Sequence, residues 1–487
     1  MAQRTFGLAL ALLVGCNFNA FDPYEKTAPI RVLDAPTDHG GKPGFGRELA
    51  TFHGQVGGET VSRIFASAGE NSAIAIRRIW DGEKLGGDTL TRCKSSADCG
   101  QGVGAPLIPF ETWAHDTPQE QTGCILAPGR PNAFVFCETA KGADANFKLD
   151  LLEGNDETRT HFGGAGLPTG HPLGVALLGA VLIHEPTQVA RYGRVYYQPD
   201  FQPTEAFGGK VSPLEDLPIL DPAQAAPFAD ASDAGDFGYA IVTHEGEDGR
   251  VLIVVSQPSK QQVIVASFDA ARAGESPAEK VHTHACLAAP AGAGAGFGKH
   301  LALGDVTGDN IPELLVGHDP MAEAEAAERV WVYPGTGLPP ALAPSEETTA
   351  CPDWQAAPTE ITCPGGAEHV SCESSAFGAS FAVGDVDGDG TGDLIVGAPR
   401  ATVHGVPEAG AVWVIPSRGA AAALAPDAAV TLTGADKKRA HLGQTTGAVR
   451  TAGRDEPVAG APGEERLYLF TCSDLETENR SQFCLPR

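Results

Sequence analysis

Residues 376–400 read AFGASFAVGDVDGDGTGDLIVGAPR, and this stretch decides how the rest of the chain is interpreted. The flanking runs Phe381–Val383 and Leu394–Val396 are short and apolar, as strands are. Ca²⁺ takes six to eight oxygen ligands in loose geometry, so a loop with an oxygen at every second position suits it. We therefore expect a strand-loop-strand calcium site, in which four carboxylates and one backbone carbonyl, at position 391, bind the ion. Its ligand residues are Asp385, Asp387, Asp389, Thr391 and Asp393.

A second loop repeats the pattern in residues 296–320, GFGKHLALGDVTGDNIPELLVGHDP. We expect weaker calcium binding here, because a neutral hydroxyl replaces one Asp and a longer Glu replaces another. For both loops the alternative is a polar turn without an ion. The segment His244–Arg250 is one residue short of the pattern and leaves open a third, degenerate site. The ligands expected in the second loop are Asp305, Thr307, Asp309, the Ile311 carbonyl and Glu313.

The two loops share more than their acidic residues. A Phe-Gly pair, a D-x-D-x-D-G-x-x-D loop and the run Leu-Ile-Val-Gly-Ala-Pro resemble the FG-GAP repeat, which builds a seven-bladed β-propeller in integrin α-subunits. Pairs of an apolar residue with Gly recur along the chain, and each is followed by a β-rich run. The seven pairs are Phe45-Gly46, Val103-Gly104, Phe162-Gly163, Phe237-Gly238, Phe297-Gly298, Phe377-Gly378 and Leu442-Gly443.

These repeats predict an all-β fold, a seven-bladed β-propeller of FG-GAP repeats over residues 30–470. One repeat alone cannot cover both faces of its sheet, so the repeats must stack around an axis. Ile30–Leu33 reads as a final strand before a Gly-rich turn. We therefore expect it to complete the last blade, whose own chain ends near Phe470.

Composition agrees with a turn-rich all-β protein: the 487 residues include 60 Gly, 37 Pro and only 2 Met. The formal net charge of −28 argues against nucleic acid and anionic membrane surfaces as partners. Part of this acidity belongs to the expected calcium ligands. We expect a monomer.

The N-terminal residues 1–15 carry Arg4 and then an apolar run too short to span a membrane, which is typical of a secretory signal peptide. Leu13-Val14-Gly15-Cys16 resembles the lipobox of bacterial lipoproteins. This resemblance implies that Cys16 is lipidated, with 16–29 as a tether to the outer membrane, on its periplasmic or cell-surface face. The alternative is an ordinary signal peptide cut just beyond.

The remaining ten of the eleven cysteines form an even set, which suits disulfides in an oxidising compartment. Local spacing suggests short bridges, and one longer connection takes the two cysteines left over. Sequence alone does not fix the connectivity. The expected pairs are Cys93–Cys99, Cys124–Cys137, Cys286–Cys351, Cys363–Cys372 and, stapling a C-terminal tail over 471–487, Cys472–Cys484.

Catalytic motifs are absent from the sequence: it has no H-E-x-x-H, G-x-S-x-G, Walker A or C-x-x-C pattern. His282, His284 and Cys286 could bind a transition metal, but a disulfide at Cys286 and two surface histidines are the simpler interpretation. We expect two structural calcium ions and no enzymatic activity. The expected role is adhesion to a protein or polysaccharide ligand, and the alternatives are catalysis (hydrolase) in the propeller channel or a structural subunit of an envelope assembly.

Overall fold

The computed structural model describes residues 30–35, 44–56 and 59–68, individual strands between 75 and 220, and most of 237–470. Gaps in the last range are 246–250, 269–280, 294–295, 319–327, 338–356, 366–368, 419–423 and 452. The described residues are all-β: they form strands and three short 3₁₀ turns, η5 (Pro258–Lys260), η7 (Gly335–Gly337) and η8 (Pro426–Ala428). No described helix has the length and apolar character needed to cross a bilayer.

Seven four-stranded antiparallel sheets make up most of the described chain. The first three use strands that follow one another in sequence, so each sheet is a simple meander. Their strands are β2 (Leu49–Val56), β3 (Glu59–Ala68), β4 (Ala75–Arg78) and β5 (Thr89–Arg92); β6 (Ile108–Trp113), β7 (Gln121–Ala127), β8 (Ala133–Glu138) and β9 (Asp144–Leu149); β10 (Arg159–Gly166), β11 (Ala176–His184), β12 (Ala190–Gln198) and β13 (Ile219–Leu220).

The next three sheets have the same order, except that a two-stranded sheet of β22 (Val370–Ser371) and β25 (Thr402–Val403) is inserted at the sixth. Their strands are β14 (Ile241–Glu245), β15 (Val251–Gln257), β16 (Gln262–Phe268) and β17 (Val281–Ala288); β18 (His300–Gly304), β19 (Glu313–Gly317), β20 (Arg329–Tyr333) and β21 (Thr359–Thr362); β23 (Ser380–Gly384), β24 (Asp393–Ala398), β26 (Ala411–Ile415) and β27 (Val430–Thr433).

The seventh sheet joins the two ends of the described chain. Its strands β28 (Thr446–Thr451), β29 (Arg454–Ala461) and β30 (Arg466–Phe470) are completed by β1 (Ile30–Asp34). β1 pairs antiparallel with β30, and Ile30 lies opposite Phe470. Arg466 Nε also donates to Asp34 Oδ1 at 2.8 Å. The expectation that Ile30–Leu33 completes the last sheet is confirmed.

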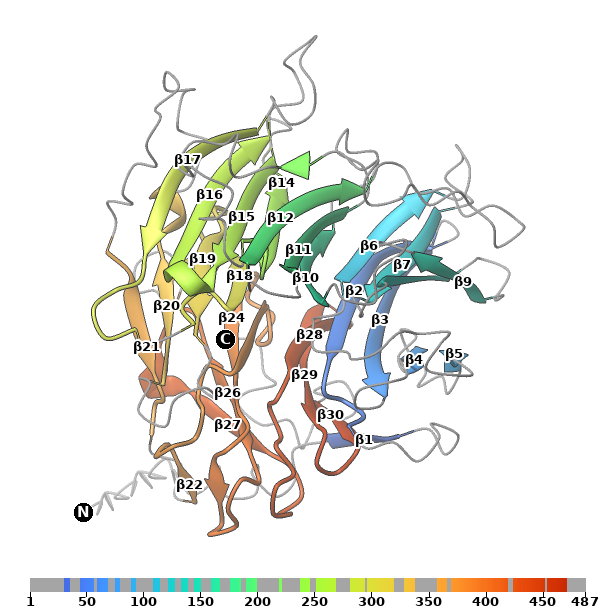
Figure 1. Ribbon diagram of the computed structural model, residues 1–487. Helices are drawn as coiled ribbons and strands as arrows, with labels where there is room; N and C mark the ends of the chain where they lie inside the picture. The colour runs from blue at the N-terminus through green and yellow to red at the C-terminus, as the bar shows by residue number, and fades with distance from the viewer. Residues whose placement is uncertain are drawn as a thin grey trace, which may run out of the picture.

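The sheets follow one another in space in chain order, and the C-terminal strands lie beside the N-terminal ones (Figure 1). The first strand of each sheet contacts the first strand of the next, in the series β2, β6, β10, β14, β18, β23 and β28. β28 in turn contacts β2. The last sheet therefore packs beside the first.

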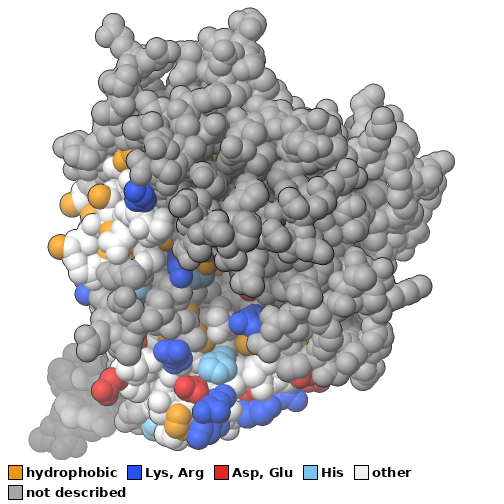
Figure 2. Space-filling view, viewed as in Figure 1, with side chains coloured by type: hydrophobic (Ala, Val, Ile, Leu, Met, Phe, Trp, Pro, Cys, Tyr) orange, Lys and Arg blue, Asp and Glu red, His pale blue; other side chains and the backbone are white. Residues whose placement is uncertain are grey.

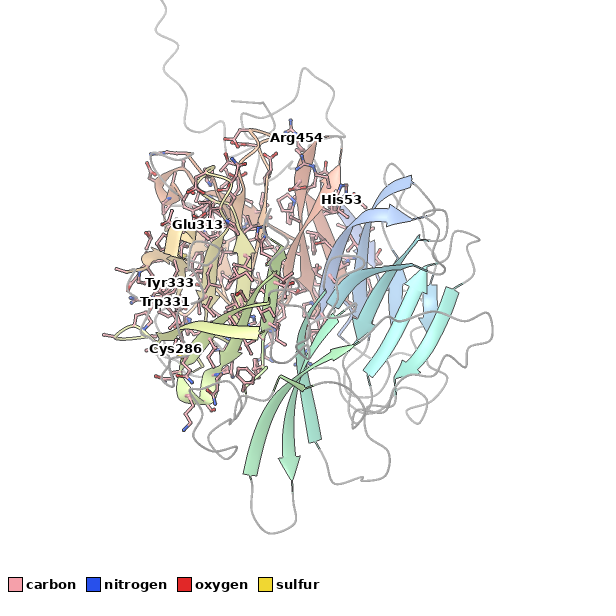
Figure 3. The ribbon with its side chains drawn as sticks, turned by 90° about the horizontal axis from the view of Figure 1, so that it is seen from above. His53, Cys286, Glu313, Trp331, Tyr333 and Arg454 are labelled. Atoms are coloured by element: carbon pink, nitrogen blue, oxygen red, sulfur yellow. A yellow bond between two sulfur atoms is a disulfide. The ribbon has the colours of Figure 1, made fainter. Side chains whose placement is uncertain are left out.

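Apolar side chains alternate between the two faces of the middle strands. On β26, Trp413 packs toward the sheet of β18–β21, whereas Val412 and Val414 pack toward the sheet of β28–β30. On β20, Trp331 packs instead toward β15 and β16. Figure 3 shows Trp331 and Tyr333 close together along one side of the molecule. Both faces of these sheets are covered by neighbours, which explains strands such as β26 in which every residue is buried.

The apolar residue fills this core in the anchor pairs whose side chains the structure describes. Phe297 meets Trp331 edge-on, with ring centroids 5.4 Å apart, and Phe377 meets Trp413 in the same way at 5.7 Å. Phe45 and Leu442 are likewise buried. Edge-to-face contacts of this kind add about 0.5–1.5 kcal/mol to the burial of the rings. The repeated pair is thus one structural unit used in successive sheets.

Phe162-Gly163 and Val103-Gly104 are the two anchor pairs that do not follow the arrangement of the others within the described residues. Phe162-Gly163 does not precede a first strand as the other described pairs do, because it lies inside β10, where Phe162 pairs with Ala180. The position of this pair within the repeat therefore differs from that of the other described anchors. Val103-Gly104 lies outside the described residues, as do the segments 1–15, 16–29 and 471–487.

One expected disulfide is present between Cys363 and Cys372. Cys286 is also disulfide-bonded, and its expected partner Cys351 lies outside the described residues. Cys124 and Cys137 are direct cross-strand partners of β7 and β8, a register that suits a bridge. Both members of the pairs 93–99 and 472–484 lie outside the described residues.

The anchor glycine Gly443 has both an unusual backbone and no room for a side chain. Its φ is 85°, and a Cβ there would lie 2.6 Å from the Ala411 carbonyl oxygen of the preceding sheet. We expect Gly443→Ala to lower the free energy of unfolding through the positive φ and also through this collision, which adds about 1–3 kcal/mol. Urea unfolding of the variant measures the loss.

Gly453 is the matched control, because its φ of 94° is similar but no described atom lies within 4 Å of the position that a methyl group would take there. Gly453→Ala should therefore cost about 1–2 kcal/mol, the backbone contribution alone. Equal losses in the two variants would show that the anchor glycine is not needed for packing between sheets.

Candidate metal centre

The loop between β23 and β24 brings three carboxylates together. Oxygen atoms of Asp385, Asp387 and Asp389 lie within 4.8 Å of one another. The loop is closed at its base by the pair of Gly384 and Asp393, the last register position of these strands. Asp385 and Asp387 are buried, and Asp389 is exposed. This is the single such group of acidic, His or Cys side chains in the part of the chain that the structure describes.

The donor set fits a hard cation. The Oδ1 atom of Asp385 is buried and accepts no hydrogen bond from any described group. Three neighbouring negative charges repel one another, and a buried carboxylate oxygen without a partner carries a desolvation cost. A bound calcium ion would remove both costs, because carboxylate oxygens are its usual ligands. If the three side chains bound one ion, its further coordination positions would be filled by backbone oxygens or water.

Backbone N–H groups hold the loop in this shape. Asp389 N donates to Asp387 Oδ1 at 3.1 Å, and Thr391 N donates to Asp389 Oδ1 at 2.8 Å. The intervening Gly388 and Gly390 have φ values of 79° and 90°, which favour glycine. Thr391 itself is half-buried at the end of this turn. The alternating acid-glycine sequence therefore forms successive tight turns that direct the carboxylates to one side.

Asp393 lies outside this group of three aspartates, and its side chain accepts hydrogen bonds from the backbone. Its Oδ2 accepts from Val386 N at 2.9 Å and from Asp387 N at 3.2 Å. Its Oδ1 accepts from Ser417 N at 2.9 Å. Burial, with a smaller contribution from the nearby Asp387 carboxylate, raises the pKa of Asp393 to about 7. Asp393 was expected as a fifth ligand; in the structure its side chain supports the loop backbone, and its part in binding an ion stays a prediction.

The second loop, between β18 and β19, is arranged differently. The Asp305 carboxylate accepts four backbone N–H groups: Thr307, Gly308 and Asp309 at Oδ1, 3.2, 2.6 and 3.3 Å away, and Asn310 at Oδ2, 2.8 Å away. Ile311 N donates to Asp309 Oδ1 at 2.8 Å. In the described geometry the Asp305 side chain closes a hydrogen-bonded turn, and calcium binding in this loop stays a prediction.

Glu313 has the role in this loop that Asp393 has in the other. Its Oε2 accepts from Val306 N at 2.9 Å, and its Oε1 accepts from Thr307 Oγ1 at 3.2 Å and Gly335 N at 3.3 Å. Burial raises its pKa above the ordinary value. Glu313 is thus held by the backbone and does not join Asp305 and Asp309 in a carboxylate group within the described residues.

Two residues of the seventh sheet contact the first loop, and the sequence did not assign them there. Asp455 Oδ2 accepts from Asp385 N at 2.9 Å, and Asp455 N donates to the Asp385 carbonyl at 2.7 Å. Arg450 Nη1 lies 3.6 Å from Asp385 Oδ2 and 3.3 Å from Asp455 Oδ2. Arg450 stands where the repeat would carry its first Asp. This mismatch with the pattern is the feature of the sequence that could have indicated a separate role for Arg450 at the loop.

The remaining sequence-based candidates contribute less. The degenerate loop at His244–Arg250 continues into residues outside those described. The disulfide at Cys286 removes the thiolate that a metal site with His282 and His284 would use.

The loop with the carboxylate group is also the segment that comparison with known families identifies. Residues 377–415 match the family model described as FG-GAP repeat. This segment runs from the anchor Phe377 through the loop to the end of β26. The search of curated proteins found no similar sequence.

Solved structures were compared by shape. The "Myceliophteria_thermophila Cps50 (Swd1) beta-propeller domain" has a TM-score of 0.45 and 10% identity, over 91% of this chain and 99% of that chain. Oligopeptidase B from Leishmania major has a TM-score of 0.33 and 9% identity, over 87% of this chain and 48% of that chain.

Asp393 gives the loop a pH dependence. The folded protein keeps the proton of Asp393 up to a pKa of about 7, whereas the ordinary value in the unfolded chain is 3.8. Between these pH values the folded state binds more protons, so the free energy of unfolding contributed by this group falls as the pH rises, by at most about 1.4 kcal/mol per pH unit. Urea unfolding in EDTA at a series of pH values measures the slope.

The comparison that isolates this group uses Asp393→Asn and the control Asp427→Asn. Asp427 is an exposed carboxylate that pairs with Arg418 at 2.9 Å. Asp393→Asn should flatten the slope between the two pKa values, and Asp427→Asn should keep it. An identical slope in wild type and Asp393→Asn would contradict the raised pKa.

Proposed function

We propose that this protein is a calcium-stabilised, seven-bladed β-propeller that binds a protein or polysaccharide ligand at a bacterial cell surface. Its seven four-stranded sheets, the contacts between successive first strands and the pairing of β1 with β30 support the propeller. In this proposal each sheet is one blade, and the seventh blade closes the ring against the first. The match of residues 377–415 to the FG-GAP repeat is consistent with it.

The observation that carries calcium binding is the group of Asp385, Asp387 and Asp389, in which Asp385 Oδ1 has no described donor. The ion would be structural. The ion would bind to a loop that also contacts the next sheet through Asp455. Binding would therefore stabilise the contact between β23 and β28. The second ion proposed from the sequence would bind at Asp305 more weakly, because the Asp305 carboxylate must first give up N–H groups.

The cellular location is proposed from the sequence. A lipidated Cys16 followed by a tether would hold the propeller at the outer membrane, outside the cytoplasm, where disulfides such as Cys363–Cys372 form. A rigid protein with loops of varied length between regular strands suits ligand binding, as loops on a stable scaffold generally do. We propose binding without catalysis, and a net charge of −28 makes nucleic acid an unfavourable partner.

Calcium should raise the melting temperature of the purified protein, because it binds the folded state and the separate ligands of the unfolded chain bind poorly. At a calcium concentration 100 times the dissociation constant, the gain is about 2.7 kcal/mol. Asp387→Asn should abolish most of this gain, and the control Asp427→Asn should retain it. Thermal unfolding in EDTA and in increasing calcium measures both.

Magnesium serves as a second control, since its stricter octahedral geometry suits this loose loop poorly. A melting curve that EDTA and calcium leave unmoved, together with the absence of bound metal at stoichiometric amounts, would refute the calcium part of the proposal.

Binding is tested with the whole chain, lipidated and solubilised from membranes. We expect saturable binding on a glycan array or to one cell-surface protein, without turnover on a panel of hydrolase substrates. A stoichiometric protein partner recovered from the same membrane would instead identify a structural subunit of an envelope assembly. Turnover that persists in purified protein would identify an enzyme.

A further inference from the structure

A group of two histidines and one aspartate lies at the end of the sixth sheet far from the carboxylates. It consists of His369, His404 and Asp436, which come from three separate segments of the chain. The imidazole rings of His369 and His404 have centroids 4.9 Å apart and are tilted by 39°. His404 Nδ1 lies 2.9 Å from Asp436 Oδ1.

The backbone fixes the two histidines opposite each other. β22 pairs with β25 through Val370 and Val403, so His369 and His404 lie directly beyond the paired ends of the two strands. His404 N donates to the His369 carbonyl at 2.8 Å. With ring centroids 4.9 Å apart, the two side chains are within reach of one small ion.

Two features restrict the movement of this pair. The Cys363–Cys372 disulfide closes the segment that carries His369. His404 and Gly405 form a two-residue turn in which both φ values are positive, 49° and 77°. Val403 and Val406 exchange both backbone hydrogen bonds across this turn, as in a type I′ hairpin. Asn or Gly is more usual at the first of these positions, so His404 occupies it at some conformational cost.

We propose that His369 and His404 bind a divalent transition-metal ion, of which Zn²⁺ is the probe used below. The hydrogen bond from His404 Nδ1 to Asp436 would leave Nε2 for the metal, the arrangement in which a carboxylate orients a metal-binding histidine. The two imidazoles supply two ligands, and water fills the remaining positions. Imidazole nitrogen suits Zn²⁺, Ni²⁺ and Cu²⁺ and is a poor ligand for Ca²⁺, so this site differs in chemistry from the carboxylate loop.

The site is also open and remote from that loop. The His404 side chain is 28% exposed and that of Asp436 is 49% exposed, so an ion can enter. β24 begins at Asp393, beside the carboxylate loop, and ends at Ala398, just before the hairpin of His404. Six residues of strand separate the two ends by roughly 20 Å. Acidic, basic and His side chains gather at the lower edge of the described surface in Figure 2, the end of the molecule at which Figure 1 draws β22.

The test is calorimetric titration of Zn²⁺ into the protein without a histidine tag, at neutral pH and in saturating calcium. Wild type should bind one Zn²⁺ at this site. His369→Gln and His404→Asn should each weaken the binding more than tenfold, and Asp436→Asn should weaken it roughly 10- to 100-fold, the usual effect of losing a carboxylate behind a metal-binding histidine. His404→Asn should fold at least as well as wild type, because Asn tolerates a positive φ.

His53→Gln is the matched control, an exposed histidine on β2 in another sheet, and it should bind Zn²⁺ as wild type does. Three results would overturn the proposal: no stoichiometric Zn²⁺ binding by wild type, unchanged affinity in His369→Gln and His404→Asn, or binding that Asp387→Asn abolishes and His404→Asn retains. The last result would place the zinc in the carboxylate loop. None of these outcomes depends on whether calcium binds there.

Discussion

The middle strands of these sheets carry apolar side chains on both faces, and a single four-stranded sheet cannot cover both. On β30, Leu467 and Leu469 pack toward the sheet of β2 and β3, whereas Tyr468 and Phe470 pack toward that of β23–β27. Successive side chains of a strand point to opposite faces, so each sheet must have a neighbour on either side. Stacking in chain order satisfies this requirement, and the packing of the last sheet beside the first follows from it.

This stacking also determines what the loops at the strand ends can do. The carbonyl of Asp305 accepts from Gly392 N of the next sheet at 2.9 Å, and the carbonyl of Asp385 accepts from Asp455 N at 2.7 Å. Ser417 Oγ donates to the Val306 carbonyl at 2.7 Å across the same type of seam. The first residue of each acidic loop is thus a contact between sheets as well as a candidate ligand. A change in the conformation of either loop would therefore alter the hydrogen bonds between neighbouring sheets.

The two acidic loops show how similar sequences acquire different geometry. In one, Asp385 directs a carboxylate toward Asp387 and Asp389. In the other, Asp305 turns its carboxylate to the backbone N–H groups of its own loop. A carboxylate oxygen can bind a cation or accept an N–H, and the balance depends on which other groups are near. Around Asp385 those groups include Asp455 and Arg450, which belong to the next sheet.

The sequence by itself determined the all-β class, the repeated Phe-Gly anchors of the later sheets, the position of both acidic loops and the pairing of Ile30–Leu33 with the strand that ends at Phe470. The first three are encoded locally, in the alternation of apolar residues and in glycines at tight turns, so they can be read from one segment at a time. The pairing of Ile30–Leu33 was inferred from the repeat pattern, because this segment resembles a final strand before a Gly-rich turn. Only the tertiary structure decided that Asp393 supports the backbone, that Asp455 meets Asp385, and that His369 lies opposite His404. Each of these depends on residues brought together from different strands or sheets, and the spacing of residues within one segment carries no information about a partner that arrives from another.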